Sequence, residues 1–123
     1  MFAGVYENWG AASQRICAAT NPFDGQVWTE TVRSAAIQAR NDFDNPDSAC
    51  EWYEREFLTL LSMQLASKGH VHVLDFGGGP ASTFFSIAGK LPAGDLRYDI
   101  VDTPTNCEIG RELAAKVEGL RFV

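Results

Sequence analysis

The sequence lacks any apolar run long enough to cross a membrane. A spanning helix needs about 20 consecutive apolar residues, and no segment of the 123 residues approaches that length. The opening stretch, MFAGVYENWG, has neither the charged region nor the long apolar region of a signal peptide. We therefore expect a cytoplasmic protein without a membrane partner.

Cysteines are few and basic residues are nowhere clustered. The three cysteines, Cys17, Cys50 and Cys107, show no C-x-x-C spacing, which favours reduced thiols in a reducing compartment. Ten Lys and Arg stand against 16 Asp and Glu, for a net charge of −6. Binding to a nucleic-acid backbone usually needs a clustered basic face, so nucleic acid is not an expected partner.

Two further site types lack their motifs. No G-x-x-x-x-G-K-[ST] stretch occurs, which excludes a P-loop. His70 and His72 have the spacing of a strand-borne ligand pair, but no third ligand accompanies them in the sequence. We therefore predict no metal site.

What is present is the composition of one globular domain, with 46% hydrophobic and 21% charged residues. Apolar spacing predicts short helices over 6–19 and 28–41. Ser48 and Glu51 have the form of a capping box, and a third helix is expected from there to about Ser67, stopped by Gly69. The first 68 residues therefore form an expected helical segment.

From residue 69 the pattern alternates between strand and helix. Strands are predicted over 70–76, 96–102 and 120–123, because these runs are short, apolar and β-branched. Helices are predicted over 81–89 and, with a Thr103 cap and Gly119 as its stop, over 103–119. The resulting βαβαβ order predicts an α/β fold with a parallel sheet.

The turn after the first strand carries three glycines, Gly77, Gly78 and Gly79. In a parallel unit, ligands bind at the carboxyl ends of the strands, and glycines there let the backbone approach a ligand closely. Asp102 ends the second strand and is placed to accept hydrogen bonds from a ribose diol. Together these features predict a site for a nucleoside ligand.

The spacing within the turn distinguishes two kinds of nucleoside. A dinucleotide fingerprint, G-x-G-x-x-G/A, fits Gly77 and Gly79 but meets Ser82 at its last position. The pattern acid-x-G-x-G-x-G/A, typical of S-adenosylmethionine enzymes, fits Asp75, Gly77, Gly79 and Ala81. A carboxylate beneath the turn attracts an ammonium or sulfonium group and repels a pyrophosphate, which favours S-adenosylmethionine as the cofactor.

Two longer stretches resemble a family of class I S-adenosylmethionine-dependent methyltransferases. They are GVYENW (residues 4–9) and VLDFGG (residues 73–78), joined by a Ser82–Thr83 pair before aromatics and by V-D-x-P after the second strand. The resemblance covers residues 4–123. It implies a Rossmann-like sheet, a methyltransferase activity and a small-molecule or saccharide-type substrate.

The resemblance carries cofactor-binding roles onto individual positions. These are Asp75, Phe76, Gly77, Gly78, Gly79, Ala81, Ser82, Thr83 and Asp102. Tyr6 and Trp9 are the candidates for a lid or a substrate wall, since amino-terminal helices cover the cofactor in many such enzymes. No catalytic residue is predicted, because methyl transfer depends more on positioning and in-line geometry than on acid–base groups.

The family's sheet has seven strands, and this sequence supplies three of them. Residues 69–123 are therefore expected to form the amino-terminal half of the cofactor-binding domain. The first strand would then lie at a sheet edge with unpaired backbone groups, and such edges recruit other strands. We expect either a longer parent protein or a second chain, as a homodimer or a complementing chain, to cover this edge.

Two other interpretations remain open from the sequence. The half-sheet is also compatible with a non-catalytic fragment or interaction module, and less well with part of an NAD-dependent oxidoreductase. Binding of S-adenosylmethionine, of NAD or of neither distinguishes the three.

Overall fold

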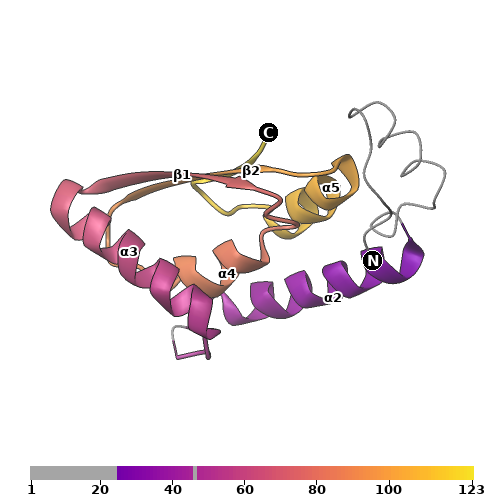
Figure 1. Ribbon diagram of the computed structural model, residues 1–123, viewed down its shortest axis with the longest axis horizontal. Helices are drawn as coiled ribbons and strands as arrows, with labels where there is room; N and C mark the ends of the chain where they lie inside the picture. The colour runs from indigo at the N-terminus through magenta and orange to yellow at the C-terminus, as the bar shows by residue number, and fades with distance from the viewer. Residues whose placement is uncertain (1–24, 46) are drawn as a thin grey trace, which may run out of the picture.

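The fold is a three-stranded parallel sheet with helices packed on one face (Figure 1). The computed structural model describes residues 25–45 and 47–123. Its elements in chain order are α2 (Gln26–Asp42), α3 (Trp52–Lys68), β1 (His70–Phe76), α4 (Ser82–Ala88), β2 (Asp95–Val101), α5 (Pro104–Leu113) and β3 (Leu120–Phe122). The α/β class expected from the sequence is confirmed, while the helix predicted over 6–19 lies outside the described residues.

The strands lie in the order β1-β2-β3, and both neighbouring pairs are parallel. β1 pairs with β2 along its whole length, from His70 opposite Asp95 to Phe76 opposite Val101. β2 in turn pairs with β3, with Tyr98 opposite Leu120. The carboxyl ends of β1 and β2 therefore lie side by side, which places the turn after β1 next to the residues after β2.

The start of α3 differs from its prediction. The capping box forms one turn later than predicted, with Glu51 as the N-cap in place of Ser48. The backbone N–H of Glu51 donates to the Glu54 carboxylate at 2.9 Å. The predicted stop is confirmed, since Gly69 takes a left-handed φ of 73° and its N–H donates to the Leu65 carbonyl at 2.8 Å.

The end of α5 also differs from its prediction, which extended the helix to Gly119. The helix ends at Leu113, because the chain must turn back to enter β3 beside β2. Lys116 takes a left-handed φ of 79° in this turn, and Val117 packs against the core. Gly119, with a φ of 80°, lies against the Leu96 carbonyl and accepts from the Tyr98 N–H at 2.7 Å.

Aromatic side chains form the core between α4 and β2. Phe84 and Phe85 of α4 and Tyr98 and Ile100 of β2 are all at most 2% exposed. The rings of Phe84 and Tyr98 meet edge to face with centroids 5.3 Å apart. Phe122 of β3 packs against the same core and against Gly110 of α5, so α4 and α5 cover the same face of the sheet.

The opposite face of the sheet carries an ion cluster. The acid of this cluster is Asp99, which is only 5% exposed. Arg121 donates to both Asp99 oxygens, at 2.7 and 2.6 Å, and His72 Nε2 lies 2.7 Å from Oδ2. The hydrogen bonds from Arg121 lower the pKa of Asp99 well below its usual range, against the opposing effect of burial. The interactions of ionised Asp99 therefore stabilise the fold at neutral pH, and this stabilisation is lost as the pH falls through the lowered pKa of Asp99.

β1 is the edge strand beside α3. The Gly69 carbonyl accepts from Asp95 N–H, and Gly77 N–H donates to the Val101 carbonyl, so the odd-numbered residues of β1 turn their backbone groups toward β2. The even-numbered residues therefore turn theirs to the edge. Two of these, Leu74 and Phe76, are also 55% and 74% exposed. No strand of the described residues pairs with this edge, which presents both backbone groups and apolar side chains.

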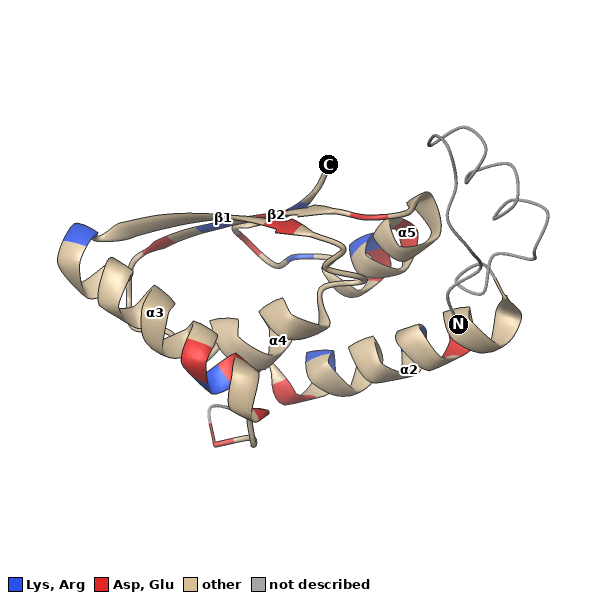
Figure 2. Cartoon of the chain, in the orientation of Figure 1, with Lys and Arg blue, Asp and Glu red and all other residues tan. Residues whose placement is uncertain are grey.

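Charged side chains are dispersed over the described elements, with both signs on helices and strands (Figure 2). None of the helices in residues 25–45 and 47–123 combines the length and the apolar character that a bilayer crossing requires.

Candidate functional site

The glycine turn joins β1 to α4 at the carboxyl edge of the sheet. Gly77 and Gly79 have φ angles of 75° and 60°, in the left-handed region where a side chain is disfavoured. The Gly77 N–H donates to the Val101 carbonyl at 2.8 Å, which anchors the turn to β2. The turn is therefore held in a fixed shape with bare backbone on its surface.

Asp102, the residue that follows β2, is hydrogen-bonded to this turn. Its Oδ2 accepts from the Gly79 N–H at 2.7 Å. Its Oδ1 accepts from the Thr103 N–H at 2.6 Å and from Asn106 Nδ2 at 2.7 Å. Burial raises the pKa of Asp102, but the hydrogen bonds from Asn106, Thr103 and Gly79 together outweigh it, so the pKa is lowered. The carboxylate is therefore ionised at neutral pH and acts only as an acceptor.

A cavity of about 360 Å³ lies between this turn and two helices. Its described lining comes from the turn (Gly77, Gly79), from the segment that runs from the end of β2 into α5 (Asp102, Thr103, Asn106) and from α2 (Trp28, Val32). Among the described lining residues, the turn and the start of α5 thus present backbone, a carboxylate and polar side chains, while α2 presents an apolar surface. Such a cavity suits a ligand that carries both hydroxyl groups and a flat apolar part.

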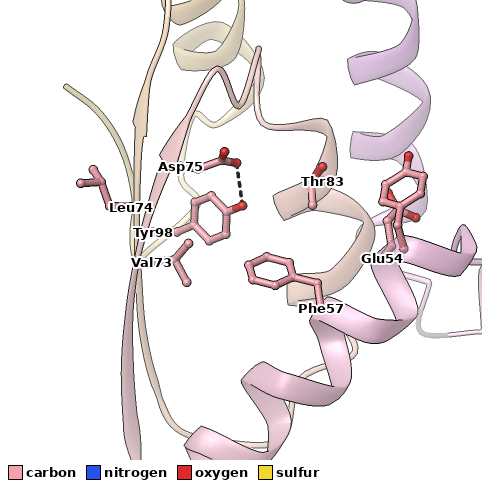
Figure 3. A pocket seen from close by; sticks show the side chains of 8 residues that line it. Glu54, Phe57, Val73, Leu74, Asp75, Thr83 and Tyr98 are labelled. Carbon is pink, nitrogen blue, oxygen red and sulfur yellow. Dashed lines mark hydrogen bonds between the residues drawn. The ribbon is translucent and has the colours of Figure 1, made fainter.

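Asp75 lies on the other side of the turn. The Tyr98 hydroxyl donates to its Oδ2 at 2.8 Å (Figure 3). A second hollow of about 370 Å³ opens here beside the β1 edge, lined by Tyr53, Glu54, Phe57, Val73, Leu74, Asp75, Thr83 and Tyr98. Burial raises the pKa of Tyr98, and the hydrogen bond to Asp75 raises it further. The Tyr98 hydroxyl therefore remains a donor. Asp75 and Thr83 therefore face a different hollow from Asp102.

Gly78 lies directly over Asp75. A Cβ at this position would come within 2.5 Å of Asp75 Oδ2. The central glycine of the turn therefore makes room for the carboxylate beneath it, while its two neighbours provide the left-handed backbone.

We predict that Gly78→Ala destabilises the fold by breaking the Asp75–Tyr98 hydrogen bond. The new methyl group displaces the Asp75 carboxylate and leaves the buried Tyr98 hydroxyl without its acceptor, at a cost of about 1 to 3 kcal/mol. Urea unfolding measures this loss. Tyr98→Phe removes the same bond, so Gly78→Ala in the Tyr98→Phe background should cost much less. Fully additive losses would contradict the shared cause.

The other predicted positions lie apart from the two hollows. Phe76 is exposed on the ion-cluster face of the sheet. Ala81 is the buried N-cap of α4, with a left-handed φ of 74°. Ser82 lines a third hollow, between α2 and the start of α3. Tyr6 and Trp9 lie outside the described residues.

Trp28, Val32, Thr103 and Asn106 line the cavity but are not among the predicted site residues. Asn106 had a usable signal, since it follows Asp102 by four residues at the start of a helix and can reach back to it. Trp28 and Val32 share one face of a helix by their spacing, but nothing in the sequence tells which element that face meets.

No model of a known protein family matches the chain, and no curated protein sequence does either. Within residues 25–45 and 47–123, no three His, Cys, Asp or Glu side chains gather as a metal site requires.

Proposed function

We propose that this chain binds S-adenosylmethionine and forms the cofactor-binding part of a methyltransferase that acts on a small-molecule or saccharide-type substrate. The observation that supports it most is the 2.7 Å hydrogen bond from Gly79 N–H to Asp102. It joins a glycine turn and a second-strand acid at the carboxyl edge of a parallel sheet, where nucleoside ligands bind in such folds.

The donor and acceptor groups of the cavity fit this cofactor. Asp102 is an ionised acceptor for the hydroxyls of a ribose. Gly77 and Gly79 present backbone without side chains, so an extended ligand can lie against them. Asp75 lies on the other side of the glycine turn and does not line this cavity. Its negative charge near the turn favours the positively charged methionine end of the ligand over a pyrophosphate.

The methyl group is supplied by the bound cofactor, whose sulfonium makes it open to attack by a nucleophile. The described residues hold and orient that donor. Asp102 fixes the ribose end, and the turn, anchored through Gly77 N–H to Val101, fixes the path of the chain beside it. Methyl transfer in this arrangement relies on positioning more than on proton transfer.

Calorimetric titration with S-adenosylmethionine, S-adenosylhomocysteine and NAD tests the proposal. We expect the first two to bind and NAD not to bind. Binding of NAD alone would favour an oxidoreductase, and binding of none would favour a non-catalytic module.

Asp102→Ala is expected to weaken S-adenosylhomocysteine binding by about 1 to 3 kcal/mol, because the ribose hydroxyls lose their charged acceptor. Asp102→Asn keeps the size and one acceptor oxygen, so it should lose less. Asp95→Ala, at the opposite end of the same strand, is the matched control and should bind as the wild type does. Equal affinity of Asp102→Ala and wild type would remove Asp102 from the site.

The open edge of β1 favours a second candidate, an interaction module. The outward backbone groups of β1 and the exposed Leu74 beside the hollow over Tyr53 and Phe57 offer an added strand both hydrogen bonds and apolar cover. A second copy or a complementing segment would fill that position. This candidate is compatible with cofactor binding, since the edge and the cavity at Asp102 lie on opposite sides of the glycine turn.

A further inference from the structure

α2 forms the apolar wall of the cavity at Asp102. Trp28 and Val32 lie one helical turn apart and line the cavity opposite the glycine turn. Trp28 is 39% exposed. Part of the indole is therefore covered by the protein and part is accessible from the cavity.

The position of this wall is fixed by contacts farther along α2. Ala36 and Ala39 are buried, at 0% and 9% exposure, so the helix approaches its neighbours closely. Arg40 donates from Nε to the Leu113 carbonyl of α5 at 3.3 Å, and its guanidinium lies 5.0 Å from the centre of the Phe43 ring. Asp102 lies just before α5, which begins at Pro104. The contact between α2 and α5 therefore also sets the place of Trp28 relative to that carboxylate.

The chemistry of the lining separates the parts of a nucleoside. Asp102 and Asn106 supply polar groups for hydroxyls, and the glycine turn supplies backbone. Of the described residues that line the cavity, Trp28 alone is aromatic. A purine base has a flat face that gains from contact with an indole, and such stacking does not depend on hydrogen bonds.

We propose that Trp28 stacks on the nucleoside portion of the ligand and is a determinant of its affinity. This rests on the proposed function, because it assumes that a nucleoside occupies the cavity at Asp102. In this arrangement Asp102 holds the ribose hydroxyls while the indole covers the nucleoside from the α2 side. The amino-acid end of the ligand then extends along the glycine turn, away from Trp28.

Titration with two ligands tests the assignment. S-Adenosylhomocysteine carries both the nucleoside and the amino-acid end, while 5′-methylthioadenosine carries the nucleoside without the amino-acid end. Trp28→Ala should weaken both by the same factor, about 10-fold or more, as expected for the loss of one base–aromatic stack. Trp28→Phe keeps an aromatic face and should retain most of the affinity.

Trp52→Ala is the matched control, because Trp52 is 65% exposed on α3 and does not line this cavity. It should leave both affinities unchanged. Tryptophan emission gives a second readout. Ligand should alter the emission of the wild type and of Trp52→Phe, and this change should be much reduced in Trp28→Phe while binding persists. Circular dichroism checks that each variant is folded.

Each result decides a different point. If the wild type binds neither ligand, the proposed function and this inference both fail. If both ligands bind and Trp28→Ala changes neither affinity, the inference fails and the proposed function stands. If Trp28→Ala weakens S-adenosylhomocysteine but not 5′-methylthioadenosine, the indole contacts the amino-acid end and the assignment to the nucleoside is wrong.

Discussion

Gly119→Ala is expected to destabilise the fold by about 3 kcal/mol, the sum of a left-handed backbone penalty and a steric clash. Gly119 has a φ of 80°, and a Cβ there would collide with the backbone carbonyl of Leu96. The neighbouring β2 strand cannot move away without breaking the hydrogen bond from Tyr98 N–H to the Gly119 carbonyl. Urea unfolding monitored by circular dichroism measures the loss.

Gly69→Ala is the matched control for this prediction. Gly69 has a similar φ of 73°, but a Cβ there meets nothing within 4 Å. It should therefore cost only the backbone penalty, about 1 to 2 kcal/mol. The difference between the two variants isolates the clash with β2. Equal losses would mean that β2 and the turn before β3 can separate without cost.

Val73→Pro is expected to unfold the protein, with a loss of at least about 3 kcal/mol, because proline removes a donor and its ring needs space. The N–H of Val73 belongs to the odd-numbered set that faces β2, so the substitution breaks the β1–β2 ladder near its centre. Circular dichroism and thermal unfolding report the outcome.

Leu74→Pro, one residue away, should be far milder. The N–H of Leu74 faces the open edge, where proline is tolerated in strands, and its side chain is already 55% exposed. We expect a loss of no more than about 1.5 kcal/mol. If Leu74→Pro unfolds the protein as Val73→Pro does, the assignment of the edge is wrong. Any strand that pairs with β1 should be excluded by Leu74→Pro while the fold persists.

The sequence predicted the strands well because their signals are local. β1 is a β-branched run bounded by Gly69 and Gly77, and the structure places it over the same residues, 70–76. The predicted end of α5 was wrong for the opposite reason, because it depends on distant parts of the chain. The stretch after Leu113 has good helical propensity, but the return of the chain to β3 requires a left-handed residue at Lys116. Tertiary geometry overrides propensity at such a turn.

The part of the candidate site's geometry that follows from strand topology could be predicted from the sequence. Parallel strands bring the turn after β1 to the residue after β2, which explains why Gly79 and Asp102 meet. The direction of the Asp75 side chain could also be predicted from the sequence. Side chains alternate along a strand, so Asp75 lies on the same face of β1 as Val73, toward the helices and Tyr98. The position of Trp28 at the cavity could not be predicted, because it depends on how α2 packs on α4 and α5.

The hydrogen bonds of Asp102 have a consequence for how a ligand would bind. An ionised carboxylate has about four acceptor positions, and Gly79, Thr103 and Asn106 already donate to three of them. A ribose diol that donates twice must therefore replace at least one of these partners, and the released N–H or amide is free to bind the ligand in return. Occupation of this site is an exchange of partners that leaves the number of hydrogen bonds nearly constant. The gain in free energy must then come mostly from apolar surfaces that shed water, and among the described lining residues these are Trp28 and Val32 of α2.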